Sequence, residues 1–208
     1  MNDVARDDVS VLSPDEVERA GRFRFEADRV RYRVARSLLR RTAANLLGVP
    51  PSDIPLETAE YGKPFITGRP FELNVSHSGD LIAVAVSASV VGVDVERIQT
   101  RTAIDEIAAR YFQDQELGFL RGLPPDAKRR AFFALWTTKE AAMKADGGGL
   151  WLSLSSVAID DPAAAGNAPV HCSVARRPWL VRPLNVPDGY CAAVATERQT
   201  SIVIKTKI

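Results

Sequence analysis

The stretch VGVDVERI, residues 91–98, decides how the rest of the chain is interpreted. Valine at its first, third and fifth positions predicts a β-strand with one apolar face. Side chains two residues apart point to the same side of a strand, so Asp94 and Glu96 are neighbours. Carboxylates about 6–7 Å apart repel each other unless water or a cation screens them. The pattern therefore fits either a solvated strand face or a bound cation.

A second stretch, LWTTKEAAMK, predicts a helix that presents Trp136, Glu140 and Lys144 on one face, because these residues are four apart. Taken alone, Glu140 and Lys144 fit a surface ion pair that contributes ~0.2–0.5 kcal/mol. Taken with Asp94 and Glu96, Glu140 gives a set of three carboxylates without cysteine. Such oxygen ligands suit a hard cation, Mg²⁺ or Mn²⁺, which keeps waters and is completed by substrate phosphates.

Basic side chains that could bind those phosphates are Arg31, Lys63, His77 and Lys144. Arg31 is notable because it falls on the apolar face of a helix expected over residues 26–47. The segment SHSG, within a turn expected from Ser76 to Asp80, adds hydroxyls and backbone amides that can donate to phosphate oxygens. A Ser-His-Asp hydrolase built from Ser76, His77 and Asp94 is disfavoured, because the chain has no G-x-S-x-G motif there.

Composition limits the class of protein. A 208-residue chain with 46% hydrophobic and 25% charged residues is typical of a globular protein of one large or two small domains. A formal net charge of +1 argues against a nucleic-acid partner, so the stripe Arg29, Arg33, Arg36 and Arg40 is interpreted as a solvated helix face. The absence of a ~20-residue apolar run argues against a membrane partner. The polar, acidic start of the chain does not resemble a signal peptide. Cys172 and Cys191 are expected to be core thiols in a reducing compartment, the cytoplasm.

The order of elements suggests an internal duplication. Helices are expected to begin after Ser13 and to cover residues 26–47, 102–112 and 127–146, with a loop at YGKPF and surface loops over 113–128. Strands are expected over residues 71–79, 80–88 and 89–98, and again over several segments towards the end of the chain. LNVSHSGDLIAVAVS from Leu73 is echoed by LNVPDGYCAAVAT from Leu184, each with the pattern strand, turn, strand. His171 is expected on a solvent-facing strand side, and Trp151 and Trp179 in packing roles.

Together, ELNVSHSGDLIAVAV, VGVDVERI and FFALWTTKEAAMKADGGGL resemble the signature blocks of Sfp-type 4'-phosphopantetheinyl transferases. RFRFEADRVRYRVARSLLRRTAANLLG and EYGKPFI are similar to the upstream blocks of that family, in the same order. The resemblance implies an α+β (α/β mixed) fold of two similar α/β halves, residues 1–98 and 99–208. These would be related by pseudo-twofold symmetry, with the site at their seam. The family usually begins with a strand, and the few residues before Ser13 are a poor match for one.

The resemblance also implies an activity, the transfer of phosphopantetheine from coenzyme A to a serine of an apo acyl or peptidyl carrier protein. Adenosine 3',5'-bisphosphate would be released. Separately, the internal duplication favours a monomer. Carried over by position, the metal ligands are Asp94, Glu96 and Glu140; Lys144 and His77 lie at the coenzyme A phosphates; and the nucleotide-side residues are Lys63, Ser76, Arg19 and Arg31. Glu140 is the candidate base, and Lys144 would stabilise the leaving bisphosphate. A non-catalytic carrier-protein or nucleotide binder is the alternative, and a different Mg²⁺-dependent phosphoryl-transfer enzyme is a more remote one.

Overall fold

The computed structural model describes residues 9–59, 63–68, 70–147, 153–197 and 202–207. Its helices are α1 (Pro14–Gly21), α2 (Glu26–Leu47), α3 (Ile104–Tyr111), α4 (Asp114–Arg121) and α5 (Pro125–Asp146). Its strands are β1 (Leu56–Thr58), β2 (Pro64–Ile66), β3 (Glu72–Ser78), β4 (Leu81–Ser87), β5 (Val91–Arg97), β6 (Val157–Ile159), β7 (Val170–Val174), β8 (Arg177–Pro183), β9 (Tyr190–Thr196) and β10 (Ile202–Lys207). Short 3-10 turns cover Val9–Val11, Pro51–Asp53 and Leu154–Ser156.

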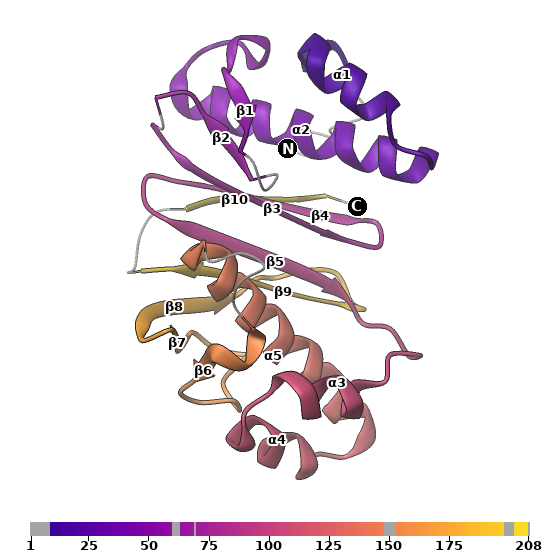
Figure 1. Ribbon diagram of the computed structural model, residues 1–208, viewed down its shortest axis with the longest axis vertical. Coiled ribbons are helices and arrows are strands. Elements are labelled where there is room, and N and C mark those ends of the chain that lie inside the picture. The colour runs from indigo at the N-terminus through magenta and orange to yellow at the C-terminus, as the bar shows by residue number, and fades with distance from the viewer. Residues whose placement is uncertain (1–8, 60–62, 69, 148–152, 198–201, 208) are drawn as a thin grey trace.

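The strands form two main sheets that lie between helices at either end of the molecule (Figure 1). One has the order β10-β4-β3 and the other the order β5-β9-β8-β7-β6, while β1 and β2 form a separate hairpin. Helix α2 shares a core with β3 and β4, and α5 shares another with β7, β8 and β9. The fold class expected from the sequence, a mixed α and β protein, is confirmed. The pseudo-twofold symmetry and the boundary at residue 98 stay predictions.

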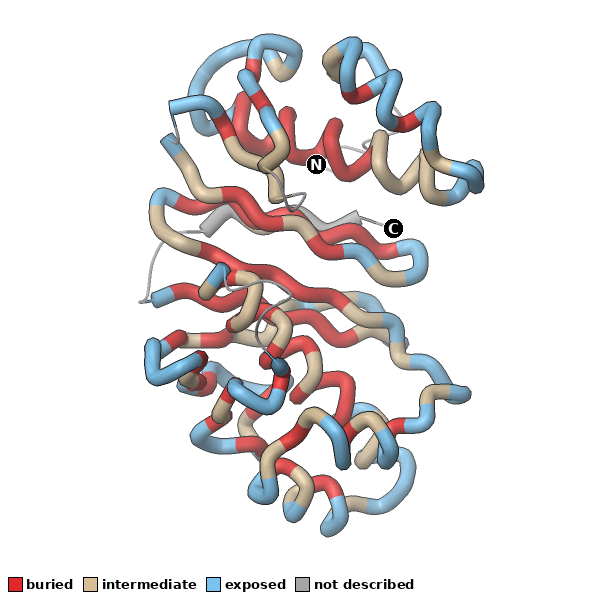
Figure 2. The backbone as a smooth tube through the Cα atoms, viewed as in Figure 1, coloured by how far each residue is buried: buried red, intermediate tan, exposed pale blue. Residues whose placement is uncertain are grey.

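Strand partners cross that expected boundary in both directions. Strand β5 precedes residue 98 but pairs with β9, with Val93 opposite Val194. Strand β10 comes last among the described strands but pairs with β4, with Ile204 opposite Ala85. A third core, which includes Leu81 and Val95, joins the two sheets through small and branched side chains. Figure 2 shows this band of buried backbone through the middle of the molecule.

Helix α5 packs unusually close to β5 because β5 has a glycine at its second position. A Cβ atom at Gly92 would lie 2.1 Å from the carbonyl oxygen of Ala141 and 2.3 Å from the amide nitrogen of Ala145. Both distances are far inside van der Waals contact, so only glycine permits this approach. The close packing brings the C-terminal turns of α5, which carry Glu140 and Lys144, beside the carboxylates of β5.

Several local predictions hold because their end signals are strong. Ser13 and Glu16 form the expected capping box at the start of α1. Helix α2 covers the expected residues and ends at Gly48, and α5 ends at Gly147; both glycines have a left-handed backbone. Residues Val9–Val11 form a 3-10 turn rather than a strand, in keeping with the poor strand pattern before Ser13.

Other local predictions are wrong. The turn expected from Ser76 to Asp80 is confined to Gly79 and Asp80, because β3 stays paired with β4 as far as Ser78, opposite Leu81. The amides of Ser76 and His77 therefore belong to a sheet and not to a turn. Pro64, within the YGKPF loop, begins β2; Tyr61 and Gly62 lie outside the described residues.

The expected surface loops over residues 113–128 contain helix α4 and the start of α5. Helix α4 begins with a capping box between Gln113 and Glu116, a signal that the sequence analysis did not use. The internal echo is also shorter than expected, because Leu184 to Val186 is not a strand. Prolines at 183 and 187 bracket this segment and have no amide hydrogen for a ladder.

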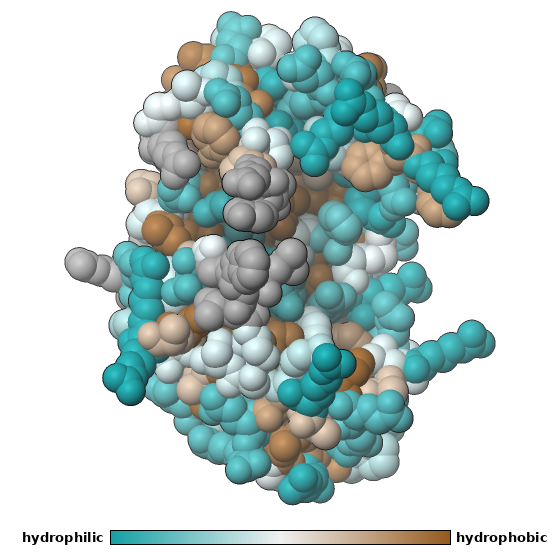
Figure 3. Space-filling view, viewed as in Figure 1, coloured by the Kyte–Doolittle hydropathy of each residue, from teal (hydrophilic) through white to brown (hydrophobic). Residues whose placement is uncertain are grey.

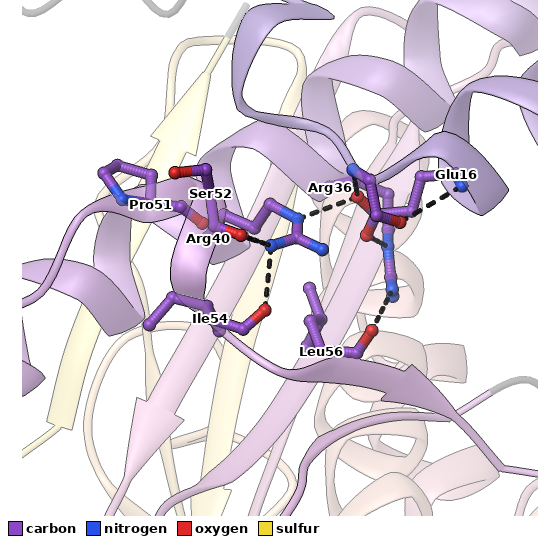
Figure 4. Close-up of polar contacts among 8 residues, drawn as sticks. Glu16, Arg36, Arg40, Pro51, Ser52, Ile54 and Leu56 are labelled. Carbon is purple, nitrogen blue, oxygen red and sulfur yellow. Dashed lines mark hydrogen bonds and ion pairs between the residues drawn. The ribbon is translucent and has the colours of Figure 1, made fainter.

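The arginine stripe of α2 is not a solvated face. Arg36 and Arg40 are 6% and 2% exposed, and both bind the carboxylate of Glu16, which is 4% exposed (Figure 4). The spacing of the stripe was correct, but α1 covers the part of the helix face that carries these two residues. The other two members of the stripe, Arg29 and Arg33, both pair with Glu26 near the surface.

The remaining packing predictions are confirmed where the structure describes them. Cys172 and Cys191 are buried free thiols, and burial raises their pKa values to about 12 and about 11. Trp179 is fully buried, and His171 is exposed. Trp151 lies outside the described residues. Among the helices that are described, none has the length and apolar character needed to cross a membrane.

Candidate active site

Asp94 is the most buried carboxylate of the candidate site. It is 2% exposed, so the wet strand face considered from the sequence is wrong for this residue. Ser76 Oγ donates to Asp94 Oδ1 at 2.8 Å, and Lys144 Nζ donates to the same oxygen at 2.6 Å. Asp94 Oδ2 is buried and has no hydrogen-bond partner among the described residues. An unpaired buried oxygen is costly, about 1–3 kcal/mol, unless a ligand satisfies it.

Side chains of β3 hold β5 in place across the gap between the two sheets. Ser78 Oγ donates to Glu96 Oε2 at 2.6 Å, and the backbone amide of Val93 donates to Asn74 Oδ1 at 3.0 Å. Ser76, Ser78 and Asn74 alternate along β3, so all three project from one strand side towards β5. Of these, the sequence analysis singled out Ser76 only; the alternation of Asn74, Ser76 and Ser78 was the available signal.

Glu140 comes from α5 and completes the set of carboxylates. The sequence spacing suggested an ion pair between Glu140 and Lys144. In the structure the Lys144 ammonium binds Asp94 and Ser76 instead. Burial raises the pKa of Glu140, and the charges of Asp94 and Glu96 raise it further. Burial also raises the pKa values of Asp94 and Glu96, against the opposing effect of Lys144. The charge of Asp94 therefore disfavours ionisation of both Glu96 and Glu140.

A pocket of about 1300 Å³ opens beside these carboxylates, lined by residues of α1, α2, β3 and α5. Helix α5 contributes Glu140 and Lys144 to the lining, and α1 and α2 contribute Arg19 and Arg31. Asp94, Glu96 and Ser76 are not among the described residues that line it; Asp94 and Ser76 are joined to it through Lys144. The space-filling view shows this face hollowed near its middle, with hydrophilic side chains around the hollow (Figure 3).

The basic residues expected to bind phosphates converge on this pocket, whose lining includes Arg19, Arg31, Lys63, His77 and Lys144. Arg31 binds Asp28 at 2.6 Å, and Lys63 binds Glu72 at 3.2 Å. Both pairs are partly exposed, so a ligand phosphate can compete for the cations. Burial, together with the charge of Arg31, lowers the pKa of His77, which makes it a neutral hydrogen-bonding group at neutral pH.

Aromatic lining residues were missed in the sequence analysis. The rings of Phe23 and Tyr32 have centroids 5.4 Å apart, and the Arg19 guanidinium lies 5.8 Å from the Tyr32 ring. On the opposite side, the ring of Tyr111 meets Trp136 edge to face. Trp136 was expected on the Glu140 face of its helix, and it does line the pocket. The clustered aromatics of the segment RFRF were a usable signal that was not followed.

The donor set fits a divalent cation, although it is not preformed. Among the described residues, no group of three or more His, Cys, Asp or Glu side chains is already arranged to hold a metal ion. Nevertheless, Asp94 Oδ2 is a buried acceptor that no described residue satisfies, and two more carboxylates are its electrostatic neighbours. Oxygen donors without thiols suit Mg²⁺ or Mn²⁺.

Comparisons with known proteins identify the family of the chain. The model of the 4'-phosphopantetheinyl transferase superfamily matches residues 90–195, and that described as 4'-phosphopantetheinyl transferase, N-terminal, matches residues 4–89. The chain is 34% identical over 197 residues to the 4'-phosphopantetheinyl transferase HetI of Nostoc sp., covering 90% of this chain and 79% of that protein. It is 31% identical over 187 residues to Sfp of Bacillus subtilis, covering 89% and 82%. It is 33% identical over 203 residues to a Bacillus pumilus relative, covering 93% and 84%.

These matches place the molecule in a class of transferase enzymes. The chain belongs to the 4'-phosphopantetheinyl transferase superfamily, as its sequence blocks indicated.

Proposed function

We propose that this enzyme transfers 4'-phosphopantetheine from coenzyme A to a serine of an apo acyl or peptidyl carrier protein and releases adenosine 3',5'-bisphosphate. The observation that carries the proposal is the pocket in which Glu140 and Lys144 face Arg19 and Arg31. A pocket that combines Glu140 and Lys144 of α5 with Arg19 of α1 and Arg31 of α2 suits a ligand that has a pyrophosphate at one end and a further phosphate at the other. Coenzyme A has this distribution of charge.

The carboxylates would hold the metal. Asp94, through the Oδ2 atom that no described residue satisfies, together with Glu96 and Glu140 would bind Mg²⁺, with Mn²⁺ as a substitute. When bound, the ion supplies charge neutralisation to the pyrophosphate. The raised pKa of Glu140 suits a group that accepts a proton, so Glu140 is assigned to deprotonate the carrier serine.

The basic residues would orient the substrate. Lys144 lies between Asp94 and the pocket, where it can donate to a phosphate oxygen and stabilise charge on the departing bisphosphate. His77 would donate to the same phosphates as a neutral imidazole. Arg19, Arg31 and Lys63 would bind on the nucleotide side, and Ser76 would act indirectly, by holding Lys144 at 3.0 Å.

The setting of the reaction is part of the same proposal. Both sides of the pocket come from one chain, which supports a monomer. The buried free thiols of Cys172 and Cys191 support the cytoplasm, and the formal net charge of +1 supports action without a nucleic-acid partner. A non-catalytic binder is the competing function. The raised pKa of Glu140 favours the enzyme, because a binder of phosphates gains nothing from a proton-accepting carboxylate beside them.

Intact-mass measurement tests the activity directly. Several apo carrier proteins are incubated with the chain, coenzyme A and Mg²⁺, and one of them should gain the phosphopantetheine mass. Glu140→Gln keeps the shape and removes the base, so kcat should fall at least ~100-fold while folding is preserved. Glu106→Gln, on the exposed side of α3, is the matched control and should keep wild-type turnover. Full turnover by Glu140→Gln would show that Glu140 is not the base, whereas failure of the wild-type chain to modify any carrier would point to the binder.

A further inference from the structure

Helix α1 is attached to the protein mainly by one buried carboxylate. Its buried residues are Glu16 and Ala20, and Val17 is 47% exposed. Glu16 Oε1 accepts from Arg36 Nε at 2.5 Å, and Glu16 Oε2 accepts from Arg40 Nε at 2.7 Å. An eight-residue helix with so little apolar burial depends on these charged hydrogen bonds for its position.

The guanidinium groups on the other side of this contact are themselves fixed. Arg40 Nη1 donates to the carbonyls of Pro51, Ser52 and Ile54, and Arg36 Nη2 donates to that of Leu56 (Figure 4). Because backbone carbonyls of residues 51–56 hold both guanidinium groups, the carboxylate of Glu16 has one defined position between them. Burial alone would raise the pKa of Glu16, but the Ser13 amide and both guanidinium groups outweigh it and lower the pKa.

Helix α1 carries Arg19 into the pocket. Glu16, Arg19 and Ala20 lie at i, i+3 and i+4, so the pocket-lining guanidinium is one turn from the buried carboxylate on the same helix side. Arg19 also lies over the ring of Tyr32, a residue of α2. The position of Arg19 relative to the pocket is therefore set by the Glu16 contact.

We propose that Glu16 is a positioning residue for substrate recognition: through Arg36 and Arg40 it holds α1 so that Arg19 meets the 3'-phosphate of coenzyme A. The inference rests on the proposed function. It assigns to Glu16 the preference for coenzyme A over dephospho-coenzyme A, which lacks that phosphate. Glu16 itself does not touch the substrate.

The test compares KM and kcat for the two substrates. In Glu16→Gln, KM for coenzyme A should rise about tenfold, the effect of losing one charged hydrogen bond. KM for dephospho-coenzyme A and kcat should change less than about twofold, because neither depends on the 3'-phosphate contact. Arg19→Ala should show the same pattern, and the double variant should match Arg19→Ala rather than multiply the two effects. Glu18→Gln is the matched control: it makes the same change on the same helix, at an exposed pair with Arg22, and should keep the wild-type preference.

A purely structural role for Glu16 gives a different result. It would lower the melting temperature of Glu16→Gln and leave the ratio of the two KM values unchanged. That result overturns the proposal, whether both KM values stay the same or both rise by an equal factor. If Glu16→Gln does not fold, Glu16→Asp keeps the charge on a shorter side chain and should give an intermediate ratio; an unchanged ratio there also overturns it. Failure of the proposed function is distinguishable, since the wild-type chain would then modify no carrier. Calorimetric binding of coenzyme A and dephospho-coenzyme A to the variants would still report on Glu16.

Discussion

The ammonium of Lys144 lies 2.6 Å from Oδ1 of Asp94 and connects the last turns of α5 to the middle of β5. The contact is asymmetric, because the Asp94 side chain is 4% exposed and that of Lys144 is 30% exposed. The lysine can therefore turn towards a ligand, whereas the aspartate cannot. A phosphate that attracts Lys144 would release Asp94 Oδ1, so substrate binding and cation binding at Asp94 are expected to help each other.

Removing the Lys144 charge should change how stability depends on pH. Asp94 has a raised pKa in the folded protein, so its contribution favours folding at low pH and is lost as pH rises through the folded pKa. Lys144→Met removes a charge that opposes this shift. In chelator, the variant should lose more stability than wild type in thermal unfolding as pH rises above the usual pKa range of an aspartate. Adding Asp94→Asn should remove the extra loss, and parallel pH profiles for Lys144→Met and wild type would contradict the assignment.

Divalent cations should stabilise the protein most at alkaline pH. Burial raises the pKa values of Asp94, Glu96 and Glu140, so protons compete with a cation for all three. The increase in melting temperature on adding Mg²⁺ should be larger at about pH 8 than at about pH 5, since stabilisation follows the ratio of ligand concentration to Kd. Glu96→Gln should reduce the increase at the higher pH. An equal increase in this variant would remove Glu96 from the ligand set.

Gly92→Ala should destabilise the fold and misplace the site. The new Cβ would contact the backbone of Ala141 and Ala145, which side-chain rotation cannot relieve. We expect a loss of at least ~1–3 kcal/mol in urea unfolding, the usual effect of overpacking. Transfer activity should fall as well, because α5 carries Glu140 and Lys144.

Gly118→Ala is the control for this change. Gly118 is exposed within α4, and a Cβ atom added there would have no atom of the described residues within 4 Å. Alanine should stabilise the helix at this position by ~0.5–1 kcal/mol. A stable, active Gly92→Ala would show that α5 can move away from β5 without effect.

Lys139→Met should cost far more stability than a comparable change at the surface. Lys139 is fully buried; its Nζ lies 2.8 Å from Glu116 Oε2 and 2.6 Å from the carbonyl oxygen of Val157. Removing it leaves the buried charge of Glu116 without a cation: Oε1 already has no partner among the described residues, and Oε2 keeps only the backbone amide of Gln113, at ~3–5 kcal/mol. Lys128→Met is the comparison, because Lys128 lies on the same helix as Lys139. It breaks a half-exposed pair with Asp105 of α3 and should cost less than ~1 kcal/mol. Chemical denaturation measures both, and equal losses would mean that the buried pair contributes no more than the surface one.

Much of the site was predictable because its parts are local. Alternation placed Asp94 and Glu96 on one side of β5, and spacing by four placed Glu140 and Lys144 on one side of α5. Glycines with left-handed backbone marked the ends of the two long helices. These signals depend on neighbours within a few residues, which a sequence displays directly.

What covers each face was not predictable in the same way. Arg36 and Arg40 have the spacing of a solvated stripe, and their burial depends on Glu16, 20 and 24 residues earlier in the chain. Asp94 appeared solvated because its covering residues, Ser76 and Lys144, are 18 and 50 residues away. A charged residue shows its spacing in the sequence, whereas its partner is chosen by tertiary packing.

The crossed strand partners have a consequence for the life of the chain in the cell. When the segment up to β5 has left the ribosome, β4 lacks its neighbour β10, although every residue of β4 is buried in the finished protein. At the same stage β5 lacks its partner β9. The two sheets cannot be completed until synthesis has reached β9 and β10. Residues 1–98 therefore cannot complete either sheet before the later part of the chain is available. The same arrangement makes β10 the cover of a sheet edge: loss of β10 would expose the unpaired backbone groups of β4, an edge to which other chains can add.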